Sequence, residues 1–380
     1  MSSGSSAAAD LARYLSFDDA RRIARRKLPR GLFDYIDRGV GEEATLRALR
    51  DRLDAARIVP RILNGQQTSA TTCHLFGRDY AAPFIVAPTA MAGLVHRDGE
   101  FGLARAAGAA GIPFSLSTQS ISAVDEVARA APDTDIWMQL YLWQDMSFSE
   151  GLLKRASDAG SHVLVMTVDT PAGSRKEWNI RSGFDMPFRI CARSVADLAL
   201  RPNWLLSVVA PLMLRGGLPE MRNFPEGLRP RLIGRPVDPG LRLIADLNWQ
   251  HVDWVRERWP GKLVLKGILS VQDAEKAVSA GADGIVVSSH GARNFDASPA
   301  PIDALPEIAA QIGNRLTVLA DSGIKRGLDA FRYTTRGASA VMLGRLPLWA
   351  LAAGGEAMVR SAFDALQHEY AEARSYTALS

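Results

Sequence analysis

Cysteine is scarce in this 380-residue sequence, which contains only Cys73 and Cys191. Two isolated cysteines are too few for a disulfide framework, and they lack the clustered spacing of a zinc site. We therefore expect no structural metal and no disulfide scaffold. A reducing cytoplasm is the simplest compartment for such a chain.

Long apolar runs are missing as well. No segment approaches the roughly 18 consecutive apolar residues that are needed to cross a bilayer. The first residues, MSSGSSAAADLARYLS, lack a basic stretch followed by an apolar core, so they do not resemble a secretory signal. We expect residues 1–15 to be a flexible leader and residues 16–380 to form a single cytoplasmic domain.

Neither a strong net charge nor a nucleotide-binding glycine motif is present. The net charge of +4 is too weak to indicate a nucleic-acid partner, although residues 181–235 hold nine arginines against four acidic residues. No G-x-G-x-x-G follows the first predicted strand, which argues against a nicotinamide-binding Rossmann domain.

Eight short apolar segments alternate with helical patterns from residue 84 onward. The predicted strands are 84–88, 113–117, 136–141, 163–169, 263–266, 285–289, 317–321 and 340–344. The helical patterns between them are 99–110, 122–131, 147–159, 249–259, 271–280, 302–312 and 327–335. Eight strand–helix units favour an α/β fold, a (β/α)8 TIM barrel. A doubly wound sheet is the alternative, but it would need the missing glycine motif.

Two regions of the sequence lie outside this alternation of strands and helices. Residues 16–29, 31–39 and 42–56 show helical patterns before the first strand, and they predict an N-terminal helical cap that carries Tyr35. Residues 170–262 separate the fourth and fifth strands. A connection of this length is usually functional or disordered, and we treat it as an insertion in the barrel.

Polar residues or glycines lie at the carboxyl end of every predicted strand. The residues in question are Pro88, Thr89, Ala90, Ser117, Gln139, Tyr141, Thr167, Asp169, Lys266, Ser288, His290, Asp321, Gly344 and Arg345. Because the carboxyl ends of barrel strands meet on one face, we expect these residues to converge there. Such convergence predicts a functional site.

The stretch from Gly281 to Asp296, GADGIVVSSHGARNFD, carries the clearest chemistry. Its apolar strand ends in His290, and Arg293 follows three residues later. This pair offers a base beside an anion-binding cation. The alternative is a surface loop with a solvated histidine.

The last two strand ends predict a phosphate site. Glycine permits a close backbone approach in DSGIKRG (321–327) and LGR (343–345), and amides at a helix start attract an anion. A glycine turn alone is the alternative. Lys266 ends a buried strand, so we expect it to face a negative group; the alternative is a salt bridge to an acid on a neighbouring strand.

These motifs together resemble the FMN-dependent α-hydroxy-acid dehydrogenases and oxidases. The resemblance extends from about Ser16 to the C-terminus and rests on FDYIDRG, VAPTAM, SLSTQS, MQLY, TVDTP, LVLKG, VSSHGARNFD, DSGIKRG and LGR. PTAMAGLVHRDGE, GIPFSLST and RPNWLL look most like the mandelate dehydrogenase and membrane-associated L-lactate dehydrogenase branch.

The resemblance implies a role for each matching residue. His290 would be the catalytic base and Asp169 its supporting acid, with Tyr35, Tyr141 and Arg293 binding the carboxylate and hydroxyl of the substrate. The flavin would be held by Pro88, Thr89, Ala90, Ser117, Gln139, Thr167, Lys266 and Ser288. Its ribityl and phosphate groups would be held by Asp321, Ser322, Gly323, Lys325, Gly344 and Arg345.

Two positions depart from the pattern of that family. Lys176 stands where a second substrate-binding arginine is usual, with Arg175 directly before it, and Lys325 replaces the commoner arginine of the phosphate loop. Lysine keeps the charge but loses the two-pronged geometry of arginine.

The expected reaction is oxidation of a mandelate-like or lactate-like (S)-2-hydroxy acid to the 2-keto acid, with FMN as cofactor. A quinone or another acceptor would then take the electrons. The alternatives are an oxidase that uses oxygen, a non-redox phosphate-binding aldolase or isomerase, and a barrel that only binds a partner. The resemblance also implies a homo-oligomer, as tetramers are common in the family.

One further expectation concerns residues 192–219, whose centre WLLSVVAPLML is flanked by arginines. Eleven apolar residues are too short to span a bilayer, but an apolar patch beside basic residues suits shallow insertion among anionic headgroups. This would place the enzyme peripherally on the inner face of the cell membrane. The alternative is that these residues pack onto the barrel or into an oligomer interface.

Overall fold

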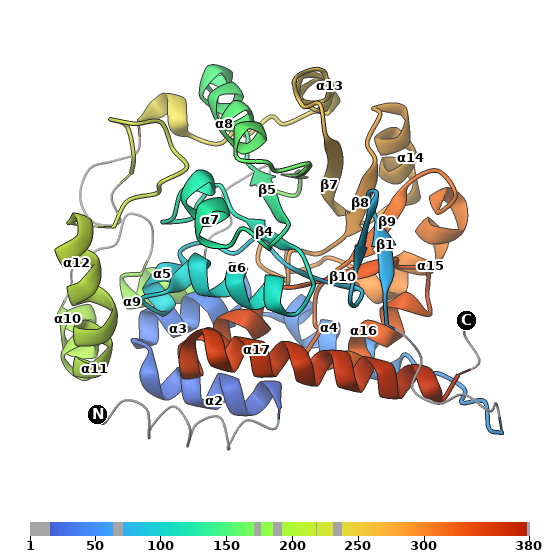
Figure 1. The fold of residues 1–380 in the computed structure, drawn as a ribbon, viewed down its shortest axis with the longest axis horizontal. Coiled ribbons are helices and arrows are strands. Elements are labelled where there is room, and N and C mark those ends of the chain that lie inside the picture. Colours follow the sequence, from blue (N-terminus) through green and yellow to red (C-terminus); the bar gives the residue numbers. More distant parts are fainter. Residues whose placement is uncertain are drawn as a thin grey trace.

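The computed structural model contains a closed barrel of eight parallel strands surrounded by helices (Figure 1). It describes residues 16–63, 71–170, 176–184, 192–217, 219–230 and 238–377. The predicted leader and Arg175 lie outside these residues. The (β/α)8 prediction is confirmed.

The barrel strands follow one another in chain order, with the last beside the first. They are β3 (Phe84–Val86), β4 (Phe114–Leu116), β5 (Ile136–Leu140), β6 (Val163–Thr167), β7 (Lys262–Ile268), β8 (Gly284–Val287), β9 (Thr317–Ala320) and β10 (Ala340–Leu343). Each predicted strand therefore exists, and most end one or two residues earlier than predicted. Gln139, Thr167 and Lys266 therefore lie within their strands, Arg345 begins the helix after β10, and the other polar residues named above lie in the loops just beyond the strands.

Helices cover the outside of the barrel, and all but the last lie where the 3.6-residue periodicity predicted them. They are α6 (Gly99–Ala109), α7 (Val124–Ala130), α8 (Met146–Asp158), α13 (Trp249–Arg258), α14 (Val271–Ser279), α15 (Pro301–Ile312), α16 (Gly327–Thr334) and α17 (Arg345–Ser375). A short helix, α5 (Ala92–Val95), precedes α6. In α17 the helix is interrupted at Gly354 and Gly355, whose backbone angles are not helical.

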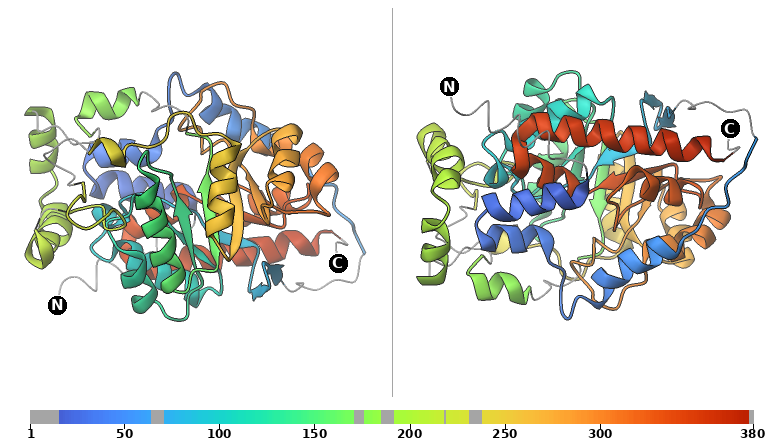
Figure 2. Two further views of the ribbon diagram at one scale, coloured as in Figure 1. Left: turned by 90° about the horizontal axis from the view of Figure 1, so that it is seen from above. Right: turned by 90° about the horizontal axis from the view of Figure 1, so that it is seen from below.

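The predicted N-terminal cap consists of α2 (Phe17–Lys27), α3 (Arg30–Asp37) and α4 (Ala44–Ala55). The Ser16 hydroxyl accepts a bond from the Asp19 amide and caps α2. Trp349 of α17 stacks on Phe33 of α3, with ring centroids 5.3 Å apart, so aromatic packing holds the cap against the barrel. Figure 2 shows α2 beside α17 from below.

A two-stranded hairpin of β1 (Cys73–Leu75) and β2 (Arg78–Tyr80) precedes the barrel and was not predicted from the sequence. Its strands are only three residues long, too short for the alternating pattern to stand out. Leu75 and Tyr80 pack with barrel-interior side chains such as Trp137 and Ile85. The hairpin therefore closes one end of the barrel interior.

The insertion between β6 and β7 is partly helical. It contains α9 (Glu177–Ser182), α10 (Ala192–Ala199), α11 (Pro202–Trp204), a π-helical turn (Leu205–Val209), α12 (Ala210–Gly216) and a 3-10 turn (Pro239–Leu241). The stretch WLLSVVAPLML is thus helical, with a π-helical turn directly before the α-helical segment that contains Pro211. In Figures 1 and 2, α10–α12 project from one end of the molecule.

We predict that Leu75→Ala will destabilise the protein by about 2–5 kcal/mol, because removing a fully buried leucine leaves a cavity. Leu75 is 1% exposed, whereas Leu63 is 100% exposed and provides the matched control Leu63→Ala. Urea unfolding should show a clear loss for the first variant and a change within about 0.5 kcal/mol for the second. Equal effects would show that the hairpin does not seal the core.

Candidate active site

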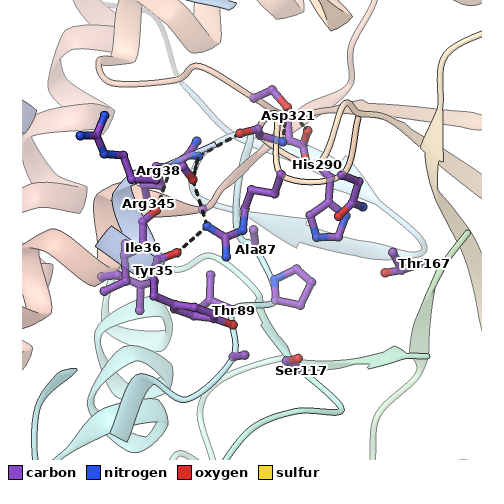
Figure 3. A pocket seen from close by; sticks show the side chains of 18 of the residues that line it. Tyr35, Ile36, Arg38, Ala87, Thr89, Ser117, Thr167, His290, Asp321 and Arg345 are labelled. Atoms are coloured by element: carbon purple, nitrogen blue, oxygen red, sulfur yellow. Dashed lines mark hydrogen bonds between the residues drawn. The ribbon is translucent and has the colours of Figure 1, made fainter. Parts of the chain in front are cut away.

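A cavity of about 960 Å³ opens at the carboxyl ends of the barrel strands. Tyr35, Ile36 and Arg38 of the cap line one side of it (Figure 3), and residues of the insertion complete its walls. Of the predicted site residues, the following line it: Tyr35, Pro88, Thr89, Ala90, Ser117, Tyr141, Thr167, Lys176, Lys266, His290, Arg293, Asp321, Ser322, Gly323, Lys325, Gly344 and Arg345. The fold therefore brings together residues that are more than 300 positions apart in the sequence.

The predicted residues Gln139, Asp169 and Ser288 lie behind this lining. Gln139 Nε2 donates to Thr167 Oγ1 at 3.0 Å, and its Oε1 accepts from Ser117 Oγ at 3.2 Å. Gln139 thus fixes two side chains that face the cavity. Asp169 and Ser288 support His290 and Lys266 in the same way.

His290 is held by Asp169, which follows β6. The distance from His290 Nδ1 to Asp169 Oδ1 is 2.8 Å. A proton on Nδ1 satisfies this carboxylate, which leaves the Nε2 lone pair to accept a proton. Asp169 is largely buried, and burial would raise the pKa of its carboxyl, but the charges of His290 and Lys266 hold it below its usual value.

Two features let this pair form. His290, Gly291 and Ala292 have φ values of 53°, 61° and 62°, so the chain makes a left-handed turn that contains two non-glycine residues. On the intervening strand, a Cβ at Gly267 would lie 2.5 Å from the Asp169 Cβ, so only glycine leaves room for Asp169.

Asn294 was not singled out from the sequence, although it lies within the same motif as His290. Its side-chain amide donates to the Asp169 backbone oxygen at 2.9 Å and to Asp169 Oδ1 at 3.3 Å. Asn294 therefore orients the carboxylate that supports His290.

Cations surround Tyr35 at the mouth of the cavity. The Arg293 guanidinium carbon lies 5.0 Å from the centre of the Tyr35 ring, and Lys176 Nζ lies 5.8 Å from it. Arg293 also donates to the Tyr35 backbone oxygen at 2.6 Å. Tyr141 lines the cavity beside them, and partial burial followed by the charge of Asp169 raises the pKa of its phenol. This group of side chains can bind a small carboxylate.

Lys266 is a buried cation between two acids. Its Nζ lies 2.8 Å from Asp321 Oδ2 and donates to Ser288 Oγ at 2.9 Å. Burial would lower the pKa of Lys266, but the charges of Asp321 and Asp169 raise it, so the side chain stays protonated. A salt bridge is thus present, although its acid, Asp321, follows β9, which is not adjacent to β7, and Lys266 also lines the cavity.

Arg345 begins α17 and reaches across the cavity towards α3 (Figure 3). It donates to the backbone oxygens of Ile36 at 3.0 Å and Gly291 at 2.9 Å. Burial, with the nearby charge of Arg293, lowers the pKa of Arg345 to about 10. Arg345 thus ties the cap to the turn that contains His290.

The loop after β9 presents backbone amides to an anion. Ser322 and Gly323 have φ values of 80° and 81°. The backbone oxygens of Asp321, Ser322 and Gly323 all accept bonds from side chains. Within the described residues, no protein group accepts from the amides of residues 322–324. Successive unpaired amides of this kind form an anion-binding nest.

Several further residues of this region were missed in the sequence. Arg50 and Phe184 line the cavity, as do Leu243 and Ile244 of the insertion. The segment with Leu243 is fixed to the β5–α8 loop, where Ile244 N donates to Leu142 O at 3.1 Å. No periodic or motif signal distinguishes these residues, because their position depends on how the cap and the insertion fold back.

The site has the features that an FMN molecule would need. The amide nest after β9 suits its phosphate, and the buried Lys266 suits a ring that gains negative charge on reduction. Groups of three or more potential metal ligands are absent from the part of the chain that the structure describes.

Comparison with known proteins gives the same assignment. The family model described as FMN-dependent dehydrogenase matches residues 24–376. The L-lactate dehydrogenase of Caulobacter sp. (strain K31) is 39% identical over 378 residues, covering 96% of this chain and 95% of the relative. The L-lactate dehydrogenase of Pseudomonas aeruginosa (strain LESB58) is 39% identical over 355 residues, covering 92% and 91%.

Solved structures agree with this assignment. The crystal structure of the monotopic membrane protein (S)-mandelate dehydrogenase matches with a TM-score of 0.87 and 32% identity, covering 96% of this chain and 95% of that one. Mandelate oxidase with benzoyl-formic acid matches with a TM-score of 0.79 and 35% identity, covering 96% and 94%. The barrel, the cavity and these likenesses lead to one conclusion: the chain belongs to the FMN-dependent dehydrogenase family and uses FMN as its cofactor.

Proposed function

We propose that the protein oxidises a small (S)-2-hydroxy acid, lactate-like or mandelate-like, to the corresponding 2-keto acid. The observation that carries this proposal is the His290–Asp169 pair, in which Asp169 supports His290 from behind and His290 lines one cavity with Arg293, Tyr35 and Tyr141. The names of the relatives and of the neighbouring structures support the substrate class. A non-redox aldolase or isomerase would not require this combination of residues.

The residues have the following roles in the proposed mechanism. Arg293 binds the substrate carboxylate with Tyr35 and Tyr141, which fixes the position of the α-carbon. His290 receives the substrate proton on Nε2, and Asp169 stabilises the imidazolium that forms. FMN, when bound, would supply the acceptor for the two electrons. Lys266 would help to hold it and, as a buried cation that lines the cavity, would favour negative charge on the flavin ring.

The acceptor that reoxidises the flavin is proposed to be a quinone, with oxygen as the alternative. The matched monotopic membrane enzyme supports a membrane location for this chain as well. Comparing turnover with oxygen and with a quinone analogue, across a panel of 2-hydroxy acids, tests the acceptor and the substrate together. We also propose a homo-oligomer, a tetramer by the family resemblance, which light scattering can test.

We predict that His290→Gln will retain FMN but lose flavin reduction by a factor of roughly 10² to 10⁴, because the general base is removed. Stopped-flow reduction at saturating substrate measures this. His368, which is exposed on α17, gives the control His368→Gln, which should reduce its flavin normally. A near-normal rate in His290→Gln would remove this residue from the mechanism.

We predict that Lys266→Met will lower the flavin midpoint potential and slow reduction more than it weakens FMN retention. The Lys266 cation stabilises negative charge on the flavin, and this charge is present mainly after electron transfer begins. Lys262 lies on the same strand, exposed and paired with Asp283, so Lys262→Met is the matched control. An unchanged or raised potential in Lys266→Met contradicts the proposed role.

We predict that Arg293→Lys will lower kcat/KM far more than Lys176→Arg. Lysine cannot copy the planar, two-pronged contact of arginine with a carboxylate. Lys176 lines the mouth of the cavity, whereas Arg175 lies outside the described residues. The two kcat/KM values show whether Arg293 or Lys176 contributes more to binding of the substrate carboxylate. If Lys176→Arg is the worse change, the lysine itself is matched to the substrate.

We propose further that the helices of residues 192–217 dock the enzyme on an anionic membrane surface. Trp204 and Val208 face the barrel, at 9% and 3% exposure, whereas Leu206 and Leu214 are 71% and 88% exposed. None of the described helices is long and apolar enough to cross a bilayer. The proposed mode of membrane binding is shallow insertion of the exposed apolar side chains into the membrane surface.

Two of the flanking arginines already have partners within the protein: Arg201 donates to the Leu28 backbone oxygen, and Arg222 pairs with Glu126. Arg189 and the side chains of Arg193 and Arg215 lie outside the described residues. Among the described residues, the exposed apolar side chains therefore carry the proposed membrane contact.

We predict that replacing Leu206 and Leu214 together by glutamate will abolish sedimentation with anionic vesicles while flavin reduction by substrate continues. Because Trp204 and Val208 stay in place, the fold is preserved. Val59 and Ile62 are 82% and 83% exposed, and their double glutamate variant serves as the control. If the intact protein does not sediment at low salt, the helices are structural only.

A further inference from the structure

The amide nest of residues 322–324 is held open by side chains that do not themselves form the nest. Asp329 of α16 accepts from the amides of Lys325 at 2.9 Å and Arg326 at 3.1 Å. Tyr333, one turn later, donates to the backbone oxygens of Asp321 at 2.9 Å and Ser322 at 2.8 Å. Both side chains are almost fully buried, at 2% and 1% exposure.

The third support comes from the N-terminal cap. Arg50 of α4 donates from its two terminal nitrogens to both oxygens of Asp329, at 2.8 and 2.9 Å. The same guanidinium donates to the Gly323 backbone oxygen at 3.2 Å, and Asp54 accepts from its Nε at 2.8 Å. Planar bidentate pairing of this kind fixes direction as well as distance.

These contacts decide which way the loop faces. Three consecutive carbonyls, those of residues 321–323, are bonded to Tyr333 and Arg50 on the protein side. The amides that follow them are consequently left for an anion in the cavity. Without these donors, the carbonyls of a loop with two positive φ residues would be free to rotate towards the cavity and repel a phosphate.

We propose that Arg50, Asp329 and Tyr333 are positioning residues for the phosphate group of the flavin, through which the N-terminal cap controls cofactor affinity. Asp329 and Tyr333 do not line the cavity and act on the phosphate only through the backbone of residues 321–326, whereas Arg50 supports the same backbone and also lines the cavity. The inference rests on FMN binding, and it concerns the phosphate rather than the isoalloxazine ring. FMN and riboflavin differ by that phosphate, so a comparison of their affinities distinguishes an effect on the phosphate from an effect on the ring.

The test compares Arg50→Gln with Arg52→Gln in the full-length apoprotein. Arg52 lies on the same helix and makes a bidentate pair with Asp303, at 2.6 and 3.0 Å, away from the loop. Flavin fluorescence titration should show that Arg50→Gln raises the Kd for FMN roughly ten- to hundredfold, because a buried carbonyl and carboxylate lose their partners. The Kd for riboflavin should change little, and Arg52→Gln should bind both flavins like the original protein.

A second variant keeps the inference testable if Arg50→Gln folds poorly. Tyr333→Phe removes one hydroxyl at almost constant volume, and it should weaken FMN, but not riboflavin, by about tenfold. Thermal unfolding of the apoproteins checks folding. Equal losses for FMN and riboflavin, or none, would overturn the positioning role. Failure of the unaltered protein to bind either flavin would instead overturn the cofactor assignment.

Discussion

The bond between His290 and Asp169 is the contact on which the rest of the site depends. It joins the loops after β8 and β6, which flank β7, and it forms only because β7 carries glycine at position 267. Parallel strands with a fixed register bring the two loops to the same face of the barrel. The left-handed turn at 290–292 then aims the imidazole, and Asn294 fixes the carboxylate.

Charges of both signs are balanced within the cavity wall. Lys266 is paired with Asp321 and lies close enough to Asp169 to affect its pKa, while Arg345 keeps its charge and donates hydrogen bonds to backbone carbonyls. Removing one partner of a buried pair leaves an uncompensated charge, which is costly. The same arrangement keeps fixed charges ready where a reaction would create new charge, without reorganisation during the step.

The cap and the insertion contribute residues to the cavity and its supports that the barrel strands do not provide. The cap contributes Tyr35 to the cavity mouth and Arg50 behind the loop after β9. The insertion contributes Lys176 and an apolar wall at Leu243 and Ile244, fixed beside Tyr141 by the bond from Ile244 N to Leu142 O. Barrels of this kind differ in function through such additions, because the strand framework is shared.

The sequence alone determined the barrel and the residues at its strand ends. Short β-branched runs followed by polar residues are local signals, so His290, Asp169, Lys266 and Asp321 could be named from the chain. Which of them touch was decided by tertiary structure. The roles of Asn294 and Arg50 could not be read from the sequence, because their partners lie 125 and 273 residues away and are reached only after the barrel closes. Tyr333 bonds to residues 11 and 12 positions away, but a helical pattern does not show which face of the helix meets the preceding loop. The hairpin at 73–80 and the direction of the apolar helix at 202–216 were likewise set by packing, since periodicity identifies an apolar face but not what it meets.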